Sequence, residues 1–163
     1  MGGHNDTNIR KFHKSDIGRL QRLIFDTIDT SYSRVYPPRA VQFFKEFHAK
    51  HRIIERSRTG TILVLEENGE LVATGSIINS EILAVFVHAK FQHDGHGKAL
   101  MRELEEEARH RGVRETELSV SLPSKRFYEG LGYEMVEEKS KDVGEGQQLN
   151  FWKAKKLLIP IQN

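Results

Sequence analysis

The sequence predicts a mixed α/β fold, in which a central, mostly antiparallel sheet of about six to seven strands is flanked by about four helices. Segments with the period of strands recur along the chain between segments with the period of helices. In the middle of the chain, a strand, a glycine-bearing loop, an amphipathic helix and another strand follow one another over 82–120. This order predicts a right-handed crossover between two parallel strands. The 163 residues are expected to form one domain over 1–163, and residues 1–6 are left out of the fold prediction.

The composition argues against several classes of protein. There are 25 Lys and Arg residues against 23 Asp and Glu, so the formal net charge is only +2, whereas a nucleic-acid-binding domain usually has a stronger basic excess. The chain has no cysteine, which removes thiolate nucleophiles, disulfides and cysteine metal sites. No apolar run reaches about 18 residues, and the N-terminus lacks the apolar core of a signal peptide. We therefore expect a cytoplasmic protein that has neither nucleic acid nor a membrane as partner.

The N-terminal third of the chain predicts one strand and two helices. Residues 8–12 alternate weakly between apolar and polar and predict the strand. Apolar residues at helical spacing then predict a helix over 15–30, and Pro37-Pro38 ends it and begins a second helix. The apolar face of the second helix consists of Ala40, Val41, Phe43, Phe44 and Phe47. The basic residues that follow, between 45 and 58, predict a solvated surface.

Three strands are predicted in the next part of the chain. The first two, at 61–66 and 70–79, are joined by Asn68-Gly69, a dipeptide typical of a tight hairpin turn. Gly75 inside the second strand predicts either a bulge or a close backbone approach. After a further turn, the apolar run over 82–87 predicts a central strand that is antiparallel to its predecessor.

Two helices and three strands are predicted in the rest of the chain. A long helix over 99–111 has an apolar stripe formed by Leu100, Met101, Leu104 and Ala108. A strand at 115–120 follows, and strands at 135–139 and 147–155 complete the sheet. Pro123 and Gly132 bracket a short helix, on whose inner face we expect Phe127 and Leu131 to stack.

The loop before the long helix has the character of an anion-binding site. Gly95 and Gly97 let the backbone turn tightly, and the first N–H groups of a helix have no partner inside it. These donors and the helix dipole favour a phosphate, although two glycines at this spacing also occur where the chain only turns. Ala99 after Lys98 excludes a Walker A loop, which needs Ser or Thr there. Leu100 excludes a dinucleotide fingerprint, which needs a third glycine at this position.

The loop matches the pattern Gln/Arg-x-x-Gly-x-Gly/Ala as Gln92-His93-Asp94-Gly95-His96-Gly97. In its place after a central strand and before a long helix, it resembles the pyrophosphate-binding loop of the GNAT superfamily of acyl-CoA-dependent N-acetyltransferases.

A second segment is similar to the GNAT pattern Asn-x-x-Ala-x-x-Phe-Tyr-x-x-x-Gly-Phe. The chain has Phe127-Tyr128, Gly132 and Tyr133 in register with it. Ser121 and Ser124 stand where the pattern has Asn and Ala. Ser121 is still able to cap the short helix, but the cofactor contact of the Asn amide is not implied for this chain.

The resemblance implies that acetyl-CoA is bound as the acyl donor, between two parallel central strands that splay apart. The residues implied to bind it are Val85, Phe86, Val87, Gln92, His93, Asp94, Gly95, His96, Gly97, Lys98, Ser121, Ser124 and Phe127. The main chain of Val85 and Val87 is implied to pair with the pantetheine arm. The charge of Asp94 opposes anion binding unless it points outward or nearby cations offset it. No metal site is expected, because the histidines near this loop lack a supporting carboxylate pattern.

An amine that attacks a thioester needs a base, a polarised carbonyl and a proton for the departing thiolate. Glu81 is implied to act as the base, directly or through water, with Glu117 as the alternative. Backbone N–H groups of residues 85–87 are candidates for polarising the carbonyl. Tyr128 is implied to protonate the thiolate. The alternatives are that Glu81 is an exposed carboxylate and Tyr128 a packing residue.

The resemblance predicts direct transfer from acetyl-CoA to a primary amine, since there is no cysteine to form an acyl-enzyme. The acceptor, a small molecule or the amine of a peptide or protein, stays open, and so does a longer acyl group. Tyr32, Tyr36, Phe43 and Phe44 either line the acceptor site or belong to the core. A silent acyl-CoA sensor and a nucleotide-binding module are the alternative functions. The apolar tail at 157–160 packs either on its own domain or on a partner, such as a second copy in a homodimer.

Overall fold

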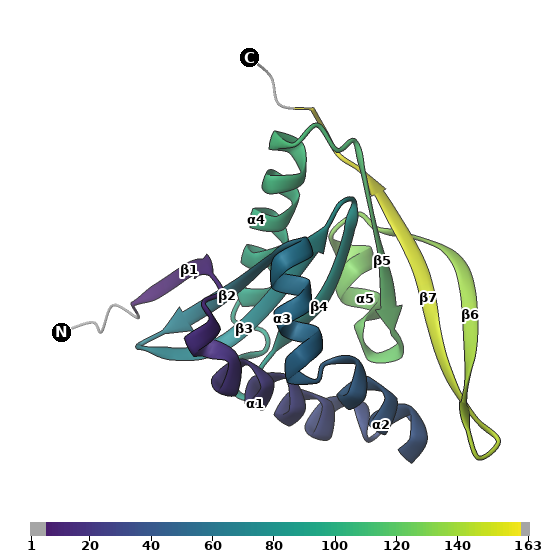
Figure 1. Ribbon diagram of the computed structural model, residues 1–163. Helices are drawn as coiled ribbons and strands as arrows, with labels where there is room; N and C mark the ends of the chain where they lie inside the picture. The colour runs from purple at the N-terminus through teal and green to yellow at the C-terminus, as the bar shows by residue number, and fades with distance from the viewer. Residues whose placement is uncertain (1–5, 161–163) are drawn as a thin grey trace.

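The computed structural model describes residues 6–160, so residues 1–5, which the fold prediction left out, and 161–163 lie outside the described part. Seven strands form one sheet in the order β1-β2-β3-β4-β5-β7-β6, and helices cover both of its faces (Figure 1). The strands are β1 (Thr7–Lys11), β2 (Thr61–Glu67), β3 (Glu70–Ile78), β4 (Glu81–Val87), β5 (Glu115–Ser121), β6 (Glu134–Gly144) and β7 (Gln147–Leu157). The α-helices are α1 (Ile17–Thr27), α2 (Pro38–Phe47), α3 (Lys50–Thr59), α4 (His96–His110) and α5 (Lys125–Gly130). Short helical turns are η1 (Lys14–Asp16), η2 (Ile28–Tyr32), η3 (Ala89–Phe91) and η4 (Leu122–Ser124).

The sheet is antiparallel except at its centre, where β4 and β5 run parallel. These two strands pair in register only at Glu81 and Glu117, next to a hydrogen bond of 3.0 Å from the Glu117 amide to the Ser80 carbonyl. Beyond this point they diverge, as the ribbon of Figure 1 shows. The mostly antiparallel sheet and the splayed central pair are therefore confirmed.

Strand β4 contains a bulge opposite Gly75. Leu83 pairs with Ser76 and Phe86 with Thr74, so Ala84 and Val85 together face the single residue Gly75. Ala84 has a φ of 55°, in the left-handed region that non-glycine residues seldom adopt. The predicted irregularity is confirmed, but the extra residue belongs to β4 rather than to the strand of the glycine.

Gly75 also permits a close helix. A Cβ atom at Gly75 would lie 2.9 Å from Cδ1 of Leu104, so its absence lets α4 approach the sheet. Leu104 belongs to the predicted apolar stripe, whose four residues are all buried in the core between the sheet and α4. A second core on the opposite face joins the sheet to α1, α2 and α3.

Helix α3 was not predicted. The basic stretch between 45 and 58 was expected to be a solvated surface, but Ile53 and Arg56 of this helix are buried. Charged residues outnumber apolar ones so strongly here that the helical period of the few buried side chains is hidden. Strands β6 and β7 are also longer than predicted and reach the turn at 145–146. Between residues 6 and 160, no helix combines the length and apolar character that crossing a membrane requires.

Candidate active site

The loop after β4 delivers free backbone donors to the start of α4. Gly95 has a φ of 83° and is the N-cap of a helix that begins at His96, slightly earlier than predicted. The Ala99 amide donates to the Gly95 carbonyl over 3.0 Å and is the first to make a helical bond. The preceding amides, from His96 to Lys98, have no acceptor within residues 6–160. The predicted anion-binding geometry is therefore present in the fold.

Gly97 brings α4 against the short helix α5. A Cβ atom at Gly97 would lie 3.0 Å from Cζ of Phe127 and 3.3 Å from Cγ2 of Val87. Phe127 is 38% exposed, so the expectation that it stacks on the inner face of its helix is wrong. Tyr128 occupies the buried side instead and is only 6% exposed. Phe127 covers the loop.

The other residues of the loop differ in their surroundings. Gln92 donates through Nε2 to the Val87 carbonyl over 3.0 Å, which ties the loop to the end of β4. Asp94 is exposed and does not line the cavity beside the loop. His96 is buried, and its Nε2 lies 3.8 Å from Oε2 of Glu67, too far for a hydrogen bond. Within residues 6–160, no group of His, Asp and Glu is arranged to hold a metal ion.

Two cavities open along β4. The first, called the loop cavity, has a volume of about 420 Å³ and is bounded by the end of β4, the loop, the start of α4, and Phe127. The second, called the strand cavity, has a volume of about 290 Å³ and lies between β4, β5, β7 and the aromatic face of α2. Five residues line both: Tyr32, Val85, Phe86, Ser124 and Tyr128. The two cavities therefore meet where β4 bulges and β5 has turned away.

Tyr128 stands at this junction with a free hydroxyl. The residue is only 6% exposed, and its hydroxyl has no hydrogen-bond partner in the described chain. Burial raises the pKa of the Tyr128 phenol far above its usual value, and the neighbouring Tyr32 and Tyr133 act in the same direction. The phenol is therefore protonated at neutral pH and free to donate.

Glu81 and Glu117, the two carboxylates of the parallel pair, are not equivalent. Glu81 is half-buried and lines the strand cavity, without an ion pair or hydrogen bond from residues 6–160. Glu117 is exposed and lines neither cavity. Of the two sequence candidates for a base, only Glu81 has access to the space beside Tyr128.

Comparison with known proteins bears on the family and the fold of this chain. A family model described as an acetyltransferase (GNAT) domain matches residues 32–146, more than half of the sequence. The chain belongs to the GNAT acetyltransferase family. No curated protein sequence matches it at a significant level.

Solved structures place the whole described chain of this GNAT protein in the same fold. The GCN5-related N-acetyltransferase from Rhodopseudomonas palustris superposes with a TM-score of 0.85 at 18% identity, over 96% of this chain and 100% of that one. The PaiA N-acetyltransferase from Thermoplasma acidophilum, in complex with coenzyme A, gives 0.76 at 20% identity over 94% and 99%. The ribosomal-protein-S18-alanine N-acetyltransferase from Escherichia coli gives 0.70 at 16% identity over 96% of each chain.

The two serines that depart from the GNAT pattern bond to each other. The Ser121 and Ser124 hydroxyls lie 2.8 Å apart. Ser121 is the N-cap residue of η4 and Ser124 that of α5, but neither hydroxyl makes a capping hydrogen bond, so Ser121 does not cap the short helix α5 as expected. Ser121 lines the strand cavity but not the loop cavity, whereas Ser124 lines both. With Asp94, Ser121 is thus a predicted cofactor residue that the fold keeps out of the loop cavity.

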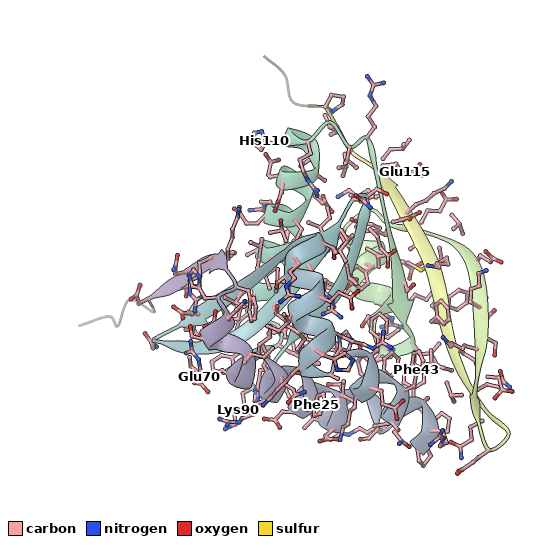
Figure 2. The ribbon with its side chains drawn as sticks, viewed as in Figure 1. Phe25, Phe43, Glu70, Lys90, His110 and Glu115 are labelled. Carbon is pink, nitrogen blue, oxygen red and sulfur yellow. The ribbon has the colours of Figure 1, made fainter. Side chains whose placement is uncertain are left out.

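The aromatic candidates of the N-terminal half separate into two groups. Tyr32, Phe43 and Phe44 line the strand cavity, and Figure 2 labels Phe43 beside α2. Tyr36 has a structural role, since its hydroxyl donates to the Asn150 carbonyl over 2.9 Å and accepts from the Leu122 amide over 2.8 Å. It ties η4 to β7 near the junction.

Sequence reasoning missed His48, which follows α2 and lines the strand cavity. Its Nδ1 lies 3.1 Å from a guanidinium nitrogen of Arg56. Burial and, to a smaller extent, the charge of Arg56 together lower the pKa of His48 to about 3. Burial likewise lowers the pKa of Arg56 to about 10. The only sequence signal was a histidine at the end of an aromatic helix face, because its partner belongs to the unpredicted α3.

Proposed function

We propose that this GNAT protein is an N-acetyltransferase that transfers the acetyl group of acetyl-CoA to a primary amine by direct attack in a ternary complex. The observation that carries the proposal is that the two cavities meet at Tyr128, which lines both of them. One cavity offers unpaired amides for a diphosphate, and the other offers a carboxylate and an apolar surface for an amine.

In this proposal the loop cavity holds the donor. The diphosphate accepts hydrogen bonds from the amides of residues 96–98, at the positive end of the α4 dipole. Asp94 is exposed, so water screens its charge, and Lys98 adds a cation in the first turn. The pantetheine arm runs along Val85–Val87, which brings the thioester to the bulge.

The chemical step uses groups from both cavities. Glu81 takes a proton from the ammonium group of the acceptor, directly or through water, and the neutral amine attacks the thioester carbonyl. A backbone N–H in the segment 85–87 stabilises the negative oxygen of the tetrahedral intermediate. The C–S bond then breaks, and Tyr128 donates its proton to the sulfur. The second proton of the amide nitrogen passes to the Tyr128 phenolate, directly or through water, and Glu81 releases its proton to solvent.

The role of Tyr128 as a proton donor depends on its pKa relative to that of the CoA thiol. In water a thiol has a pKa of about 8.5. A phenol whose pKa is raised well above this value would protonate such a thiolate only unfavourably. In this proposal the thiolate is also desolvated inside the junction, which raises the pKa of the thiol and so reduces the difference between the two pKa values.

The test is to mix the purified protein with acetyl-CoA and a panel of primary amines and to follow free CoA thiol. Calorimetry of CoA binding is the parallel measurement. Thiol release that depends on an amine supports the proposal, while CoA binding without turnover across a broad panel contradicts it.

A catalytically silent acyl-CoA-binding module is the second candidate function. It is favoured by Ser121, which replaces the Asn of the family pattern and lies outside the loop cavity. In that case CoA binds and no amine promotes thiol release.

A further inference from the structure

One buried hydrogen-bonding side chain on the wall of the strand cavity has no part in the proposed chemistry. His48 is only 4% exposed, and it lines this cavity but not the loop cavity. Its ring is perpendicular to two phenyl rings, with its centre 5.0 Å from that of Phe47 and 5.1 Å from that of Phe86. A polar ring is thus set into an apolar wall.

Arg56 fixes which ring nitrogen of His48 carries the proton. Its guanidinium nitrogen lies 3.1 Å from Nδ1 of His48, and because arginine can only donate, Nδ1 is the acceptor of this hydrogen bond. The lowered pKa of His48 keeps the ring neutral at neutral pH. The single proton of the neutral ring is therefore on Nε2, which becomes a hydrogen-bond donor.

This donor has no acceptor among residues 6–160. It is nevertheless not sealed from solvent, as Nε2 of His96 is. Since the rest of His48 is buried and the residue lines the strand cavity, the cavity is the space open to the N–H group. A buried donor without a partner costs free energy, which an oxygen atom of a ligand recovers.

The surroundings of the donor favour an uncharged oxygen. A carboxylate that left water for this place would gain a single N–H group between two phenyl rings, whereas a carbonyl oxygen is satisfied by one such bond. Arg56 polarises the imidazole from the side of Nδ1 but does not line the cavity, so it cannot contact the ligand. A carbonyl group is the better match.

The donor also lies close to the place where the amine reacts. Phe86, whose ring is next to that of His48, lines both cavities and belongs to the junction. In the proposed function, the amine nitrogen attacks the thioester at this junction. An oxygen bound to His48 is therefore only a few bonds away from the attacking nitrogen.

On the basis of the proposed function, we propose that the acceptor is an amine with an uncharged carbonyl group a few bonds from its nitrogen, and that His48 selects it. The Nε2–H group of His48 donates to the carbonyl oxygen, and Arg56 is a positioning residue that holds the ring in the donating tautomer. An apolar body of the acceptor lies among the phenyl rings of the cavity, namely Phe43, Phe44 and Phe151. This chemistry is that of an amino amide, either a small molecule or the N-terminal residue of a peptide.

The tautomer of His48 is tested by NMR and needs no turnover. A long-range ¹H–¹⁵N spectrum distinguishes the two neutral tautomers and the charged ring, and His48→Gln assigns the signals among the eight histidines of the chain. We expect the Nε2–H tautomer in the parent protein and a mixture of both tautomers in Arg56→Met. A parent ring that is protonated on Nδ1, or charged at neutral pH, overturns the proposal.

Matched acceptors test the carbonyl group. L-Phenylalaninamide and L-β-homophenylalaninamide place it at two distances from the nitrogen, 2-phenylethylamine lacks it, and L-phenylalanine has a carboxylate instead. Because a neighbouring carbonyl lowers the pKa of an amine, kcat/KM is compared per concentration of neutral amine. We expect at least one amide to exceed both other compounds about fivefold or more. Use of either other compound that equals or exceeds that of both amides overturns the proposal.

A dipeptide amide, L-phenylalanylglycinamide, distinguishes the two sources of the carbonyl. If it is used better than L-phenylalaninamide, the acceptor is the N-terminal residue of a peptide. If it is used less well, the acceptor is a small amide. Both results support selection of a carbonyl, and use of neither compound above the level of 2-phenylethylamine overturns it.

Substitutions at position 48 identify the residue that selects the carbonyl. His48→Leu should abolish the preference for the amides, while His48→Gln, which keeps an N–H donor, should retain most of it. If Arg56 without its acceptor prevents folding, the double variant His48→Leu/Arg56→Leu takes the place of the single one. His51→Leu is the control, because His51 is exposed on α3 and does not line the cavity. An unchanged preference without His48, or an equal loss in His51→Leu, contradicts the assignment.

Calorimetry separates this inference from the proposed function. If no amine releases thiol, the two amides and 2-phenylethylamine are titrated into the protein saturated with CoA. Preferential binding of an amide that is lost in the position 48 variant supports the inference even though catalysis has failed. Equal binding of all three compounds, or binding of none, overturns it.

Discussion

The Tyr133 hydroxyl donates a hydrogen bond of 3.0 Å to Oε2 of Glu105, which joins the segment after α5 to the middle of α4. The same hydroxyl accepts from Thr116 over 2.9 Å, and Oε1 of Glu105 accepts from Lys156 over 2.8 Å. This buried network holds the helix of Tyr128 against the helix of the loop.

Tyr133→Phe should therefore lower the free energy of unfolding by about 1–3 kcal/mol, because Thr116 and Glu105 each lose a buried partner. Urea denaturation measures it. Glu129→Gln, at an exposed residue without a side-chain partner in the described chain, is the control and should change stability by less than about 0.5 kcal/mol. A Tyr133→Phe protein as stable as its parent would show that the network contributes nothing.

Tyr128→Phe should reduce turnover without reducing stability. The hydroxyl it removes has no partner in the described chain, so we expect stability to be unchanged or slightly higher. Turnover should fall by about 10²–10⁴, the usual contribution of a general acid, with CoA affinity retained. Steady-state kinetics and CoA calorimetry measure the two effects. Measurable and unchanged turnover would refute the proton-donor role.

Glu81→Gln should reduce kcat/KM at neutral pH by roughly 10² or more and recover part of it at alkaline pH, where more of the free amine is already neutral. A pH–rate profile gives the comparison. Glu117→Gln is the matched control, because Glu117 lies beside Glu81 in register but lines neither cavity. Equal losses in the two variants would exclude a specific role for Glu81.

Gly97→Ala should weaken CoA binding by about fivefold or more, since the new Cβ lies 3.0 Å from Phe127 and pushes this ring or α4 out of place. Isothermal titration with CoA measures the change. Gly18→Ala is the control, because nothing lies within 4 Å of a Cβ there, and a helical alanine should stabilise the protein. Adding Phe127→Ala to Gly97→Ala should restore the part of the CoA affinity that is lost through the clash with the Phe127 ring. Unaltered CoA affinity in Gly97→Ala alone would show that this contact is not tight.

Asp16 should make stability depend on pH in the acid range. The Arg10 guanidinium holds the pKa of the Asp16 carboxyl well below its usual range, and the His13 amide and Arg19 act in the same direction against the effect of burial. A lowered pKa in the folded state means that the stabilisation is complete above about pH 4 and is lost as the pH falls further.

Asp16→Asn should accordingly cost about 3 kcal/mol at pH 7, because a buried ion pair with Arg10 at 2.8 Å is broken. The difference between parent and variant should shrink at pH 2–3. Urea denaturation at both pH values measures it, and a difference that is constant with pH would show that the charge of Asp16 is not responsible.

Much of the sheet and the loop could be predicted because their signals are local. The stripe from Leu100 to Ala108 has a single period over the whole helix, and Asn68-Gly69 forms the expected hairpin, with both residues at positive φ. The free amides at the start of α4 follow from the glycines and the helix alone.

The rest depends on contacts between distant segments. His48 is a donor only because Arg56 of α3 occupies its other nitrogen, and Lys141 reaches the strand cavity because β6 extends further than its pattern predicts. The short helix α5 carries two adjacent aromatic residues, Phe127 and Tyr128, and its six residues are too few for a period that tells which of them is buried.

The bulge at Ala84 changes which face of the sheet the following side chains of β4 project to. In an unbroken strand, Ile82 and Phe86 would project to the same face. Here Ile82 joins the core beneath α4, while Phe86 joins the core beneath α1–α3 and walls both cavities. Straightening the bulge while keeping all its residues would turn the ring of Phe86 toward α4 and the side chain of Val85 toward the opposite core, so the extra residue decides which side chains in the second half of the strand reach each core.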